Sequence, residues 1–143
     1  MKKFKFSLEK LLDYRWQIEL EAKRNYAACQ QEINEHEQQM AQLVNEKQSL
    51  LEIREETVNR MQIQQWYLLG LERQMMETQN QLLASQQKLQ QALNVYIDAQ
   101  KERKVLEKLK EKQLNEYQLL LNQEEQKMLD EMGSRKQPQA TFG

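Results

Sequence analysis

The side chains that could carry out chemistry are few and isolated. The chain has one histidine, His36, and one cysteine, Cys29, which lie seven residues apart on the same apolar stripe. A metal site needs several such ligands at short spacings, and a reactive thiol needs an accessible, electropositive setting. Both residues are therefore interpreted as part of a helix core, with the cysteine as a small apolar side chain.

No other pattern predicts catalysis. A phosphate-binding loop is excluded because no Gly-x-Gly or Gly-Lys-Ser/Thr sequence occurs. Glutamates are plentiful, but paired helices offer no cleft that excludes water around a carboxylate. The densest basic stretch, residues 101–112, is diluted by glutamates and lacks aromatic residues for base stacking. We expect no enzyme activity, no cofactor, no catalytic or metal-binding residues and no nucleic-acid partner.

The elements that position these residues must be long helices. The chain has 143 residues, of which 30% are charged and only 7% aromatic, with 3 Gly and 1 Pro. This composition is typical of a coiled coil, which buries a narrow stripe and leaves the rest in water. A single cysteine suits a reducing compartment, and charges near the N-terminus interrupt any signal-peptide pattern. We expect a cytoplasmic protein.

Two apolar stripes with three- and four-residue spacing predict two helices. The first stripe is Leu8, Leu11, Leu12, Ile18, Ala22, Tyr26, Cys29, Ile33, His36, Met40, Leu43, Leu50, Thr57 and Met61. The second is Met75, Leu82, Leu89, Leu93, Tyr96, Leu106, Leu109, Tyr117, Leu120, Leu121 and Met128. Between them, residues 61–71 contain no charge and include Gly70, which weakens a helix by about 1 kcal/mol.

The favoured fold is all-α: two long helices forming an antiparallel coiled-coil hairpin and, alone, a monomer. Helix 1 is expected over about 7–63, the tip over about 61–71 and helix 2 over about 70–132, followed by a disordered tail at 133–143. The alternative is one unbroken helix that dimerises in parallel. Charge favours the hairpin, because a turn near residue 68 pairs positions whose numbers add to about 136. Acidic residues 32–37 would then face basic residues 101–104.

Motifs at both ends resemble the flagellar FliJ family. The first is Phe4-x-Phe6-x-Leu8-Glu9-Lys10-Leu11-Leu12-x-x-Arg15. The second half carries Glu102-Arg103-Lys104-x-Leu106-Glu107-Lys108-Leu109, then Tyr117 and Glu124-Glu125-Gln126-Lys127-x-Leu129-Asp130-Glu131. The resemblance spans residues 4–132. It implies a hairpin similar to the central stalk subunits of rotary ATPases.

The resemblance also implies a role in flagellum biogenesis and motility. Such proteins belong to the type III protein export apparatus and stand in the ring of the hexameric flagellar export ATPase, promoting its assembly and activity. They also link the ring to the export-gate membrane protein and escort unloaded export chaperones, in the cytoplasm at the inner face of the membrane beneath the flagellum. The residues expected to bind the ATPase at the open end are Phe4, Phe6, Leu12, Arg15, Lys127 and Asp130. Leu8, Leu11 and Leu129 are interpreted as closing the hairpin. For Phe4 and Phe6, which precede the first helix, stapling that helix is the alternative role.

The charge-free segment supplies the candidates for a second partner site at the tip. Trp66, Tyr67, Leu69 and Leu71 form an apolar cluster that two helices meeting at a turn cannot fully bury, and it is expected to bind the export gate or chaperones. Packing on one another to close the tip is the alternative. A structural coiled-coil rod, which would show an unbroken heptad through 61–71, and the injectisome counterpart of the stalk remain alternative functions.

Overall fold

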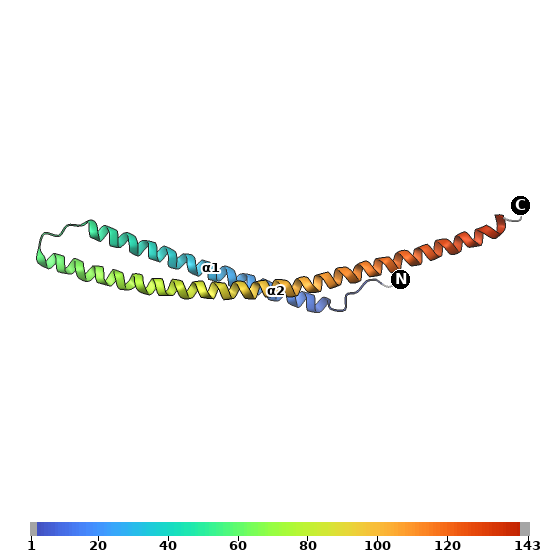
Figure 1. Ribbon diagram of the computed structural model, residues 1–143, viewed down its shortest axis with the longest axis horizontal. Helices are drawn as coiled ribbons and strands as arrows, with labels where there is room; N and C mark the ends of the chain where they lie inside the picture. Colours follow the sequence, from blue (N-terminus) through green and yellow to red (C-terminus); the bar gives the residue numbers. More distant parts are fainter. Residues whose placement is uncertain (1–2, 141–143) are drawn as a thin grey trace. The chain divides into compact units, whose positions relative to one another are not determined.

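The fold consists of two helices that pack against each other as an antiparallel hairpin (Figure 1). The computed structural model describes residues 3–140, and the side chains of residues 3–134. Helix α1 spans Glu9–Glu52 and α2 spans Val58–Ala140, and no strand occurs in the described part of the chain. The predicted all-α hairpin is confirmed.

Contacts divide the chain into two units. The turn unit is Ile18–Ala99, and the terminal unit combines Met1–Gln17 with Gln100–Gly143. Each unit contains a stretch of α1 against a stretch of α2, and each is described separately below.

The connection between the helices is residues 53–57, so the predicted turn at 61–71 is wrong. Thr57 caps α2, because its Oγ1 accepts a hydrogen bond from the backbone N–H of Arg60 at 3.3 Å. Such a cap is worth about 1 kcal/mol, and Gly70 costs the interior of α2 only about the same amount. The glycine therefore weakens the helix without ending it, and the charge-free residues lie within α2.

Gln64 closes the other side of the turn. Its Nε2 donates hydrogen bonds to the carbonyl oxygens of Leu50, at 2.6 Å, and Ile53, at 3.1 Å. Carbonyl groups at the C-terminal end of a helix have no partner within the helix. One side chain of α2 thus satisfies two carbonyls where α1 ends.

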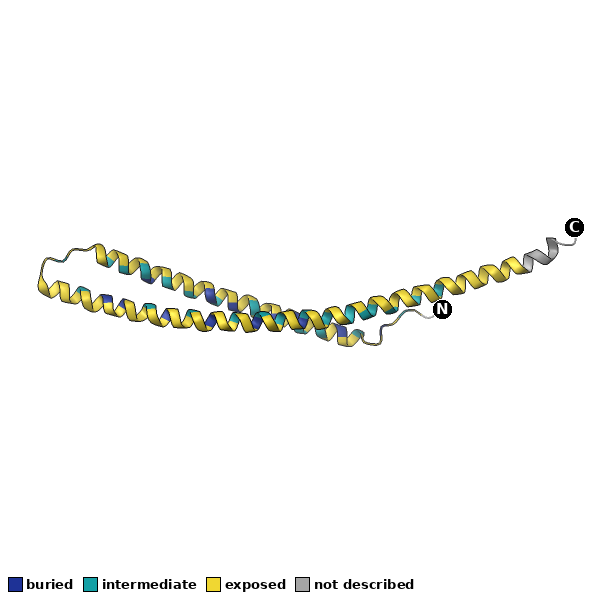
Figure 2. Ribbon diagram, viewed as in Figure 1, coloured by how far each residue is buried: buried dark blue, intermediate teal, exposed yellow. Residues whose placement is uncertain are grey.

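The buried face of α1 follows a regular heptad, as predicted from its apolar stripe. Cys29 is buried in this face, and His36 is half-buried, with Nε2 3.7 Å from Oε1 of Glu32. The buried and half-buried positions include Leu12, Arg15, Glu19, Ala22, Tyr26, Cys29, Ile33, His36, Met40, Leu43, Lys47 and Leu50. Alternating gaps of three and four keep these positions facing the partner helix. In Figure 2 the buried positions of α1 are dark blue and the half-buried ones teal, among yellow exposed positions.

The matching face of α2 is lined by small side chains that the sequence pattern did not reveal. Thr78, Ser85, Ala92 and Ala99 recur every seven residues, and each is at most 5% exposed. Larger side chains, from Leu68 to Tyr96, alternate with them. Since the separation of two packed helices depends on the side chains between them, small residues let α1 approach α2 closely.

Ion pairs between the helices fix a register different from the predicted one. They include Lys47–Glu72 (3.5 Å) and Glu32–Lys88 (3.7 Å) in the turn unit, and Glu9–Lys110 (2.9 Å) and Arg15–Glu102 in the terminal unit. The residue numbers of each pair add to between 117 and 120 rather than 136. The predicted pairing of 32–37 with 101–104 is therefore wrong, because the turn lies earlier in the chain.

The helix ends also differ from those predicted. Helix 1 ends at Glu52 rather than near 63, and helix 2 begins at Val58 rather than near 70. Helix α2 continues through Gly133 to Ala140, so the tail predicted at 133–143 is helical as far as 140. A single glycine is too weak a signal to end a helix. Residues 141–143 lie outside the described part of the chain.

Candidate functional site

The N-terminal residues predicted for the open end lie in the terminal unit and are mostly packed against α2. Phe6 and Leu12 are buried. Phe4 is half-buried, and its ring centroid lies 5.7 Å from that of Tyr117, with the rings tilted by 44°. Such aromatic pairs contribute about 0.5–1.5 kcal/mol beyond their area burial. These side chains fasten the N-terminal segment to α2 and leave little surface for a partner.

A charged cluster lies beside this packing. Arg15 forms an ion pair with Glu102 across the helices. The guanidinium of Arg103 lies 4.1 Å from the centroid of the Trp16 ring, and its Nη1 donates a hydrogen bond to Oε2 of Glu107 at 2.7 Å. The Arg103 side chain is only 11% exposed, so its charge is held between an aromatic face and a carboxylate. Sequence reasoning missed this arrangement, although Arg103 occupies a core position of the heptad.

Beyond Tyr117, α2 has no segment of α1 to pair with. Residues that face each other across the two helices have numbers that add to about 120. A position after 118 would therefore face residue 1 or an earlier position, whereas the described residues begin at 3. We call residues 118–134 the free end of α2. Five of its six large apolar side chains are between 56% and 62% exposed, and Leu121 is half-buried: the five are Leu119, Leu120, Met128, Leu129 and Met132. Figure 2 shows this end as an almost continuous exposed surface.

The remaining open-end candidates, Lys127 and Asp130, lie on this free end and are exposed. Asp130 Oδ1 accepts a hydrogen bond from Gln126 Nε2 at 3.1 Å. Lys127 follows Tyr117 by ten residues, about 15 Å along the helix. The structure therefore separates these two candidates from the packed N-terminal group. Leu129, interpreted as closing the hairpin, is exposed on the same segment.

The aromatic cluster predicted for the tip lies on the first turns of α2, in the turn unit. Trp66 is 77% exposed, and Tyr67 and Leu69 are each more than half exposed. Leu71, in contrast, is only 4% exposed, because it shares the heptad face of Leu68 that packs against α1. Three of the four candidates are therefore available to a partner, and Leu71 is part of the core.

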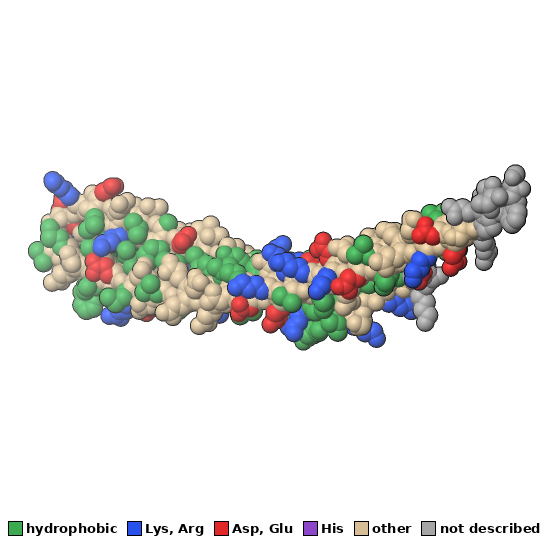
Figure 3. Space-filling view, turned by 45° about the vertical axis from the view of Figure 1, so that its right-hand side comes forward, with side chains coloured by type: hydrophobic (Ala, Val, Ile, Leu, Met, Phe, Trp, Pro, Cys, Tyr) green, Lys and Arg blue, Asp and Glu red, His purple; other side chains and the backbone are tan. Residues whose placement is uncertain are grey.

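Exposed apolar side chains continue along the same outward side of α2. Trp66, Leu69, Met76 and Leu83 are separated by three, seven and seven residues, and each is at least 50% exposed. We call this set the outer stripe. Figure 3 shows hydrophobic side chains on the surface at this end of the molecule. Exposed apolar side chains that gather on one side of a helix are candidates for an interaction surface.

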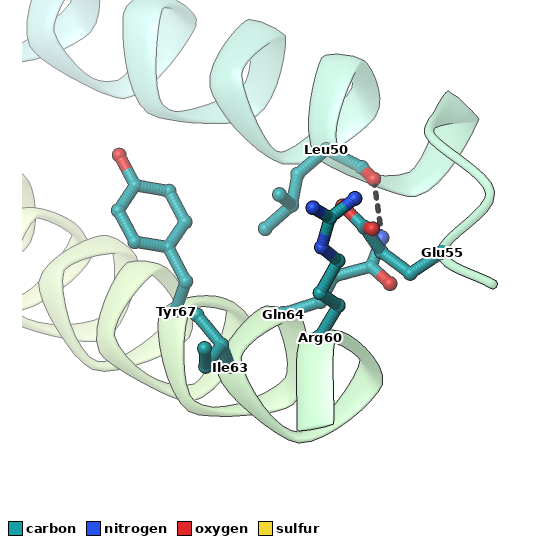
Figure 4. Close-up of a pocket in the computed structure, with 6 residues that line it drawn as sticks. All are labelled: Leu50, Glu55, Arg60, Ile63, Gln64 and Tyr67. Carbon is teal, nitrogen blue, oxygen red and sulfur yellow. Dashed lines mark hydrogen bonds between the residues drawn. The ribbon is translucent and has the colours of Figure 1, made fainter. Parts of the chain in front are cut away.

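A groove adjoins these residues at the turn (Figure 4). Leu50, Ile63 and Tyr67 form its apolar walls, and Glu55 and Arg60 lie at its rim. Gln64 also lines it, and its bond to the carbonyl of Leu50 holds the two helices together there. The groove encloses about 400 Å³, enough for one or two apolar side chains of a partner.

Four findings bear on chemistry and identity. Within residues 3–134, no three or more His, Cys, Asp or Glu side chains are grouped as a metal site would require. Neither described helix combines the length and apolar character needed to cross a bilayer. The family model described as flagellar FliJ protein matches residues 4–139. No curated protein and no solved structure was found to match the chain.

Proposed function

This chain belongs to the FliJ family, which is part of the flagellar protein export apparatus, and on that premise we propose that it is a stalk for the hexameric export ATPase. The proposal is non-enzymatic: the protein binds within the ATPase ring, promotes its assembly or activity, and connects it to the export gate and to unloaded export chaperones. It would act in the cytoplasm at the inner face of the membrane beneath the flagellum, and would be monomeric when alone.

The observation that carries the proposal is the free end of α2. Among the described residues it has no partner helix, and five of its six large apolar side chains are more than half exposed. A helix in water normally buries its apolar stripe, so this segment needs a binding surface from another molecule. Lys127 and Asp130 lie among these side chains and can orient the contact through charge. A single helix is about 10 Å wide and fits a narrow channel through a ring.

The N-terminal candidates have a supporting role in this proposal. Phe4, Phe6 and Leu12 pack the start of the chain onto α2, and Arg15 pairs with Glu102. They would hold the base of the free end rigid while its exposed side chains contact the ATPase. A single stalk in a six-fold ring touches its subunits unequally. Unequal contacts with two subunit states shift the populations of those states.

The second contact is proposed for the turn unit. Trp66, Tyr67 and Leu69 are exposed beside the groove at the turn, and exposed aromatic side chains frequently anchor partner proteins. This surface is the one we assign to the export gate or export chaperones. Leu71 contributes by packing the helix beneath it.

The direct test is an ATPase assay with the purified export ATPase of the same organism. Adding this protein should raise the hydrolysis rate or the fraction of ATPase in rings, while the protein alone should hydrolyse no ATP. An ATPase whose rate and ring formation are unaffected by saturating amounts of the folded protein would contradict the proposal.

A further inference from the structure

The leucines that begin the free end of α2 point in three different directions. Leu119, Leu120 and Leu121 are consecutive, and each residue of an α-helix is turned by about 100° from the one before it. Leu119 and Leu120 are 60% and 56% exposed, and Leu121 is half-buried. A helix that packs on one neighbour buries a single apolar stripe. These three side chains do not form such a stripe, so one neighbouring helix cannot cover them all.

Four apolar side chains of the free end continue the side of α2 that packs against the start of the chain. Tyr117 marks that side, because its ring lies against the ring of Phe4. Measured around the helix from Tyr117, these four side chains lie within about 60°. We call this the seam side, and its apolar members are Leu120, Leu121, Met128 and Met132. A helix that continued in the place of α1 would cover them.

Two leucines of the free end point elsewhere. Leu119 lies about 160° around the helix from Tyr117, and Leu129 lies about 120° from it. They are 60% and 61% exposed, and we call their side the far side. The N-terminal segment and α1 pack on the side of Tyr117, where Phe4 contacts its ring and Glu9 pairs with Lys110. A longer hairpin would therefore leave both leucines in water.

The five charged side chains of the free end are divided unevenly between the two sides. Glu124 and Glu131 lie on the seam side, within about 40° of Tyr117. Glu125 and Lys127 lie at the two edges, each about 80° from Tyr117. Asp130 alone is on the far side, at about 140°. The far side thus carries two exposed leucines and a single charge.

Apolar side chains on opposite sides of one helix indicate that the helix is enclosed when it functions. Helices with this pattern lie inside a larger protein structure or cross a bilayer, and neither described helix has the length and apolar character for a bilayer. A flat protein surface, or one partner helix, would leave either the seam side or the far side in water. Protein that surrounds the free end would cover both.

We propose that the free end of α2 is enclosed by an apolar constriction, formed by several subunits of the export ATPase ring, that contacts the seam side and the far side at once. The inference rests on the proposed function, from which it takes the partner. It adds that the contact surrounds the helix rather than running along one face. Basic groups of the ring lie opposite Glu124 and Glu131 on the seam side, since charges across an interface are complementary.

Two double variants compare the sides. Leu119→Ala with Leu129→Ala removes the far-side leucines, and Leu120→Ala with Met128→Ala removes two seam-side side chains of nearly equal exposure. In a titration of the purified export ATPase, each double variant should raise the concentration for half-maximal activation at least about tenfold. Val95→Ala, which removes a 56% exposed side chain of the turn unit, is the control and should leave activation unchanged.

The outcomes separate this inference from the stalk proposal. If one double variant, shown to be fully helical by circular dichroism, activates the ATPase at the wild-type concentration while the other is impaired, the free end is bound on one side only. Enclosure is then refuted and the stalk proposal stands. An ATPase that does not respond to the wild-type protein would refute the stalk proposal and this inference with it.

Discussion

Replacing Leu120 and Met128 together by alanine tests whether the free end of α2 is a binding surface. These side chains are 56% and 62% exposed, so the stability of the hairpin should change by less than about 0.5 kcal/mol. Full burial of a leucine or methionine contributes about 1.5–3 kcal/mol, and roughly 60% of that remains available to a partner, or about 1–2 kcal/mol each. Losing both, about 2–4 kcal/mol, should raise the protein concentration for half-maximal ATPase activation roughly 30- to 800-fold.

The assay is a titration of the purified export ATPase with wild-type and variant protein, with helicity checked by circular dichroism. The control is Val95→Ala, which removes a side chain that is likewise 56% exposed but belongs to the turn unit, and which should leave both stability and ATPase activation unchanged. If the double variant is fully helical and activates the ATPase at the wild-type concentration, the free end is not the contact surface.

Three further predictions address the turn, the charged cluster and the second partner site. Thr57→Ala should lower the free energy of unfolding by about 1 kcal/mol in urea titration, because the cap on α2 is lost; an unchanged midpoint would contradict this. Arg103→Ala should lower the free energy of unfolding by about 0.5–2 kcal/mol, because the cation over the Trp16 ring is removed. Equal thermal midpoints for the variant and the wild type would show that this contact does not stabilise the hairpin. Trp66→Ala with Tyr67→Ala should weaken binding to the purified export gate or chaperones and leave ATPase activation intact. If the double variant lost partner binding and ATPase activation to the same degree, the two sites would not be separate.

The core of α1 could be predicted from sequence because apolar residues occupy most of its heptad positions. The core of α2 could be predicted only in part. Its most buried positions, Thr78, Ser85, Ala92 and Ala99, are small or polar, so a pattern based on large apolar side chains passes over them. Their strict seven-residue spacing is the signal that would have revealed them.

The turn and the register were harder to predict for a physical reason. In a chain that is 30% charged, many antiparallel registers bring opposite charges together, and each exposed pair contributes less than about 1 kcal/mol. Charge matching therefore supports antiparallel pairing without fixing the offset. The uncharged residues 61–71 were interpreted as a turn, but they continue the heptad through Leu68 and Leu71 and display Trp66 on the surface. The chain does turn back on itself, at 53–57.

Contact of the free end of α2 with the export ATPase is the central claim, and site-specific photocross-linking in living cells tests it most directly. A benzophenone amino acid is placed at Met128 in one strain and at Trp66 in another, since both positions are more than half exposed. Irradiation should join the Met128 variant to the export ATPase and should not join the Trp66 variant to it. Cross-linking of the ATPase at Trp66 but not at Met128 would contradict the assignment of the free end to the ring.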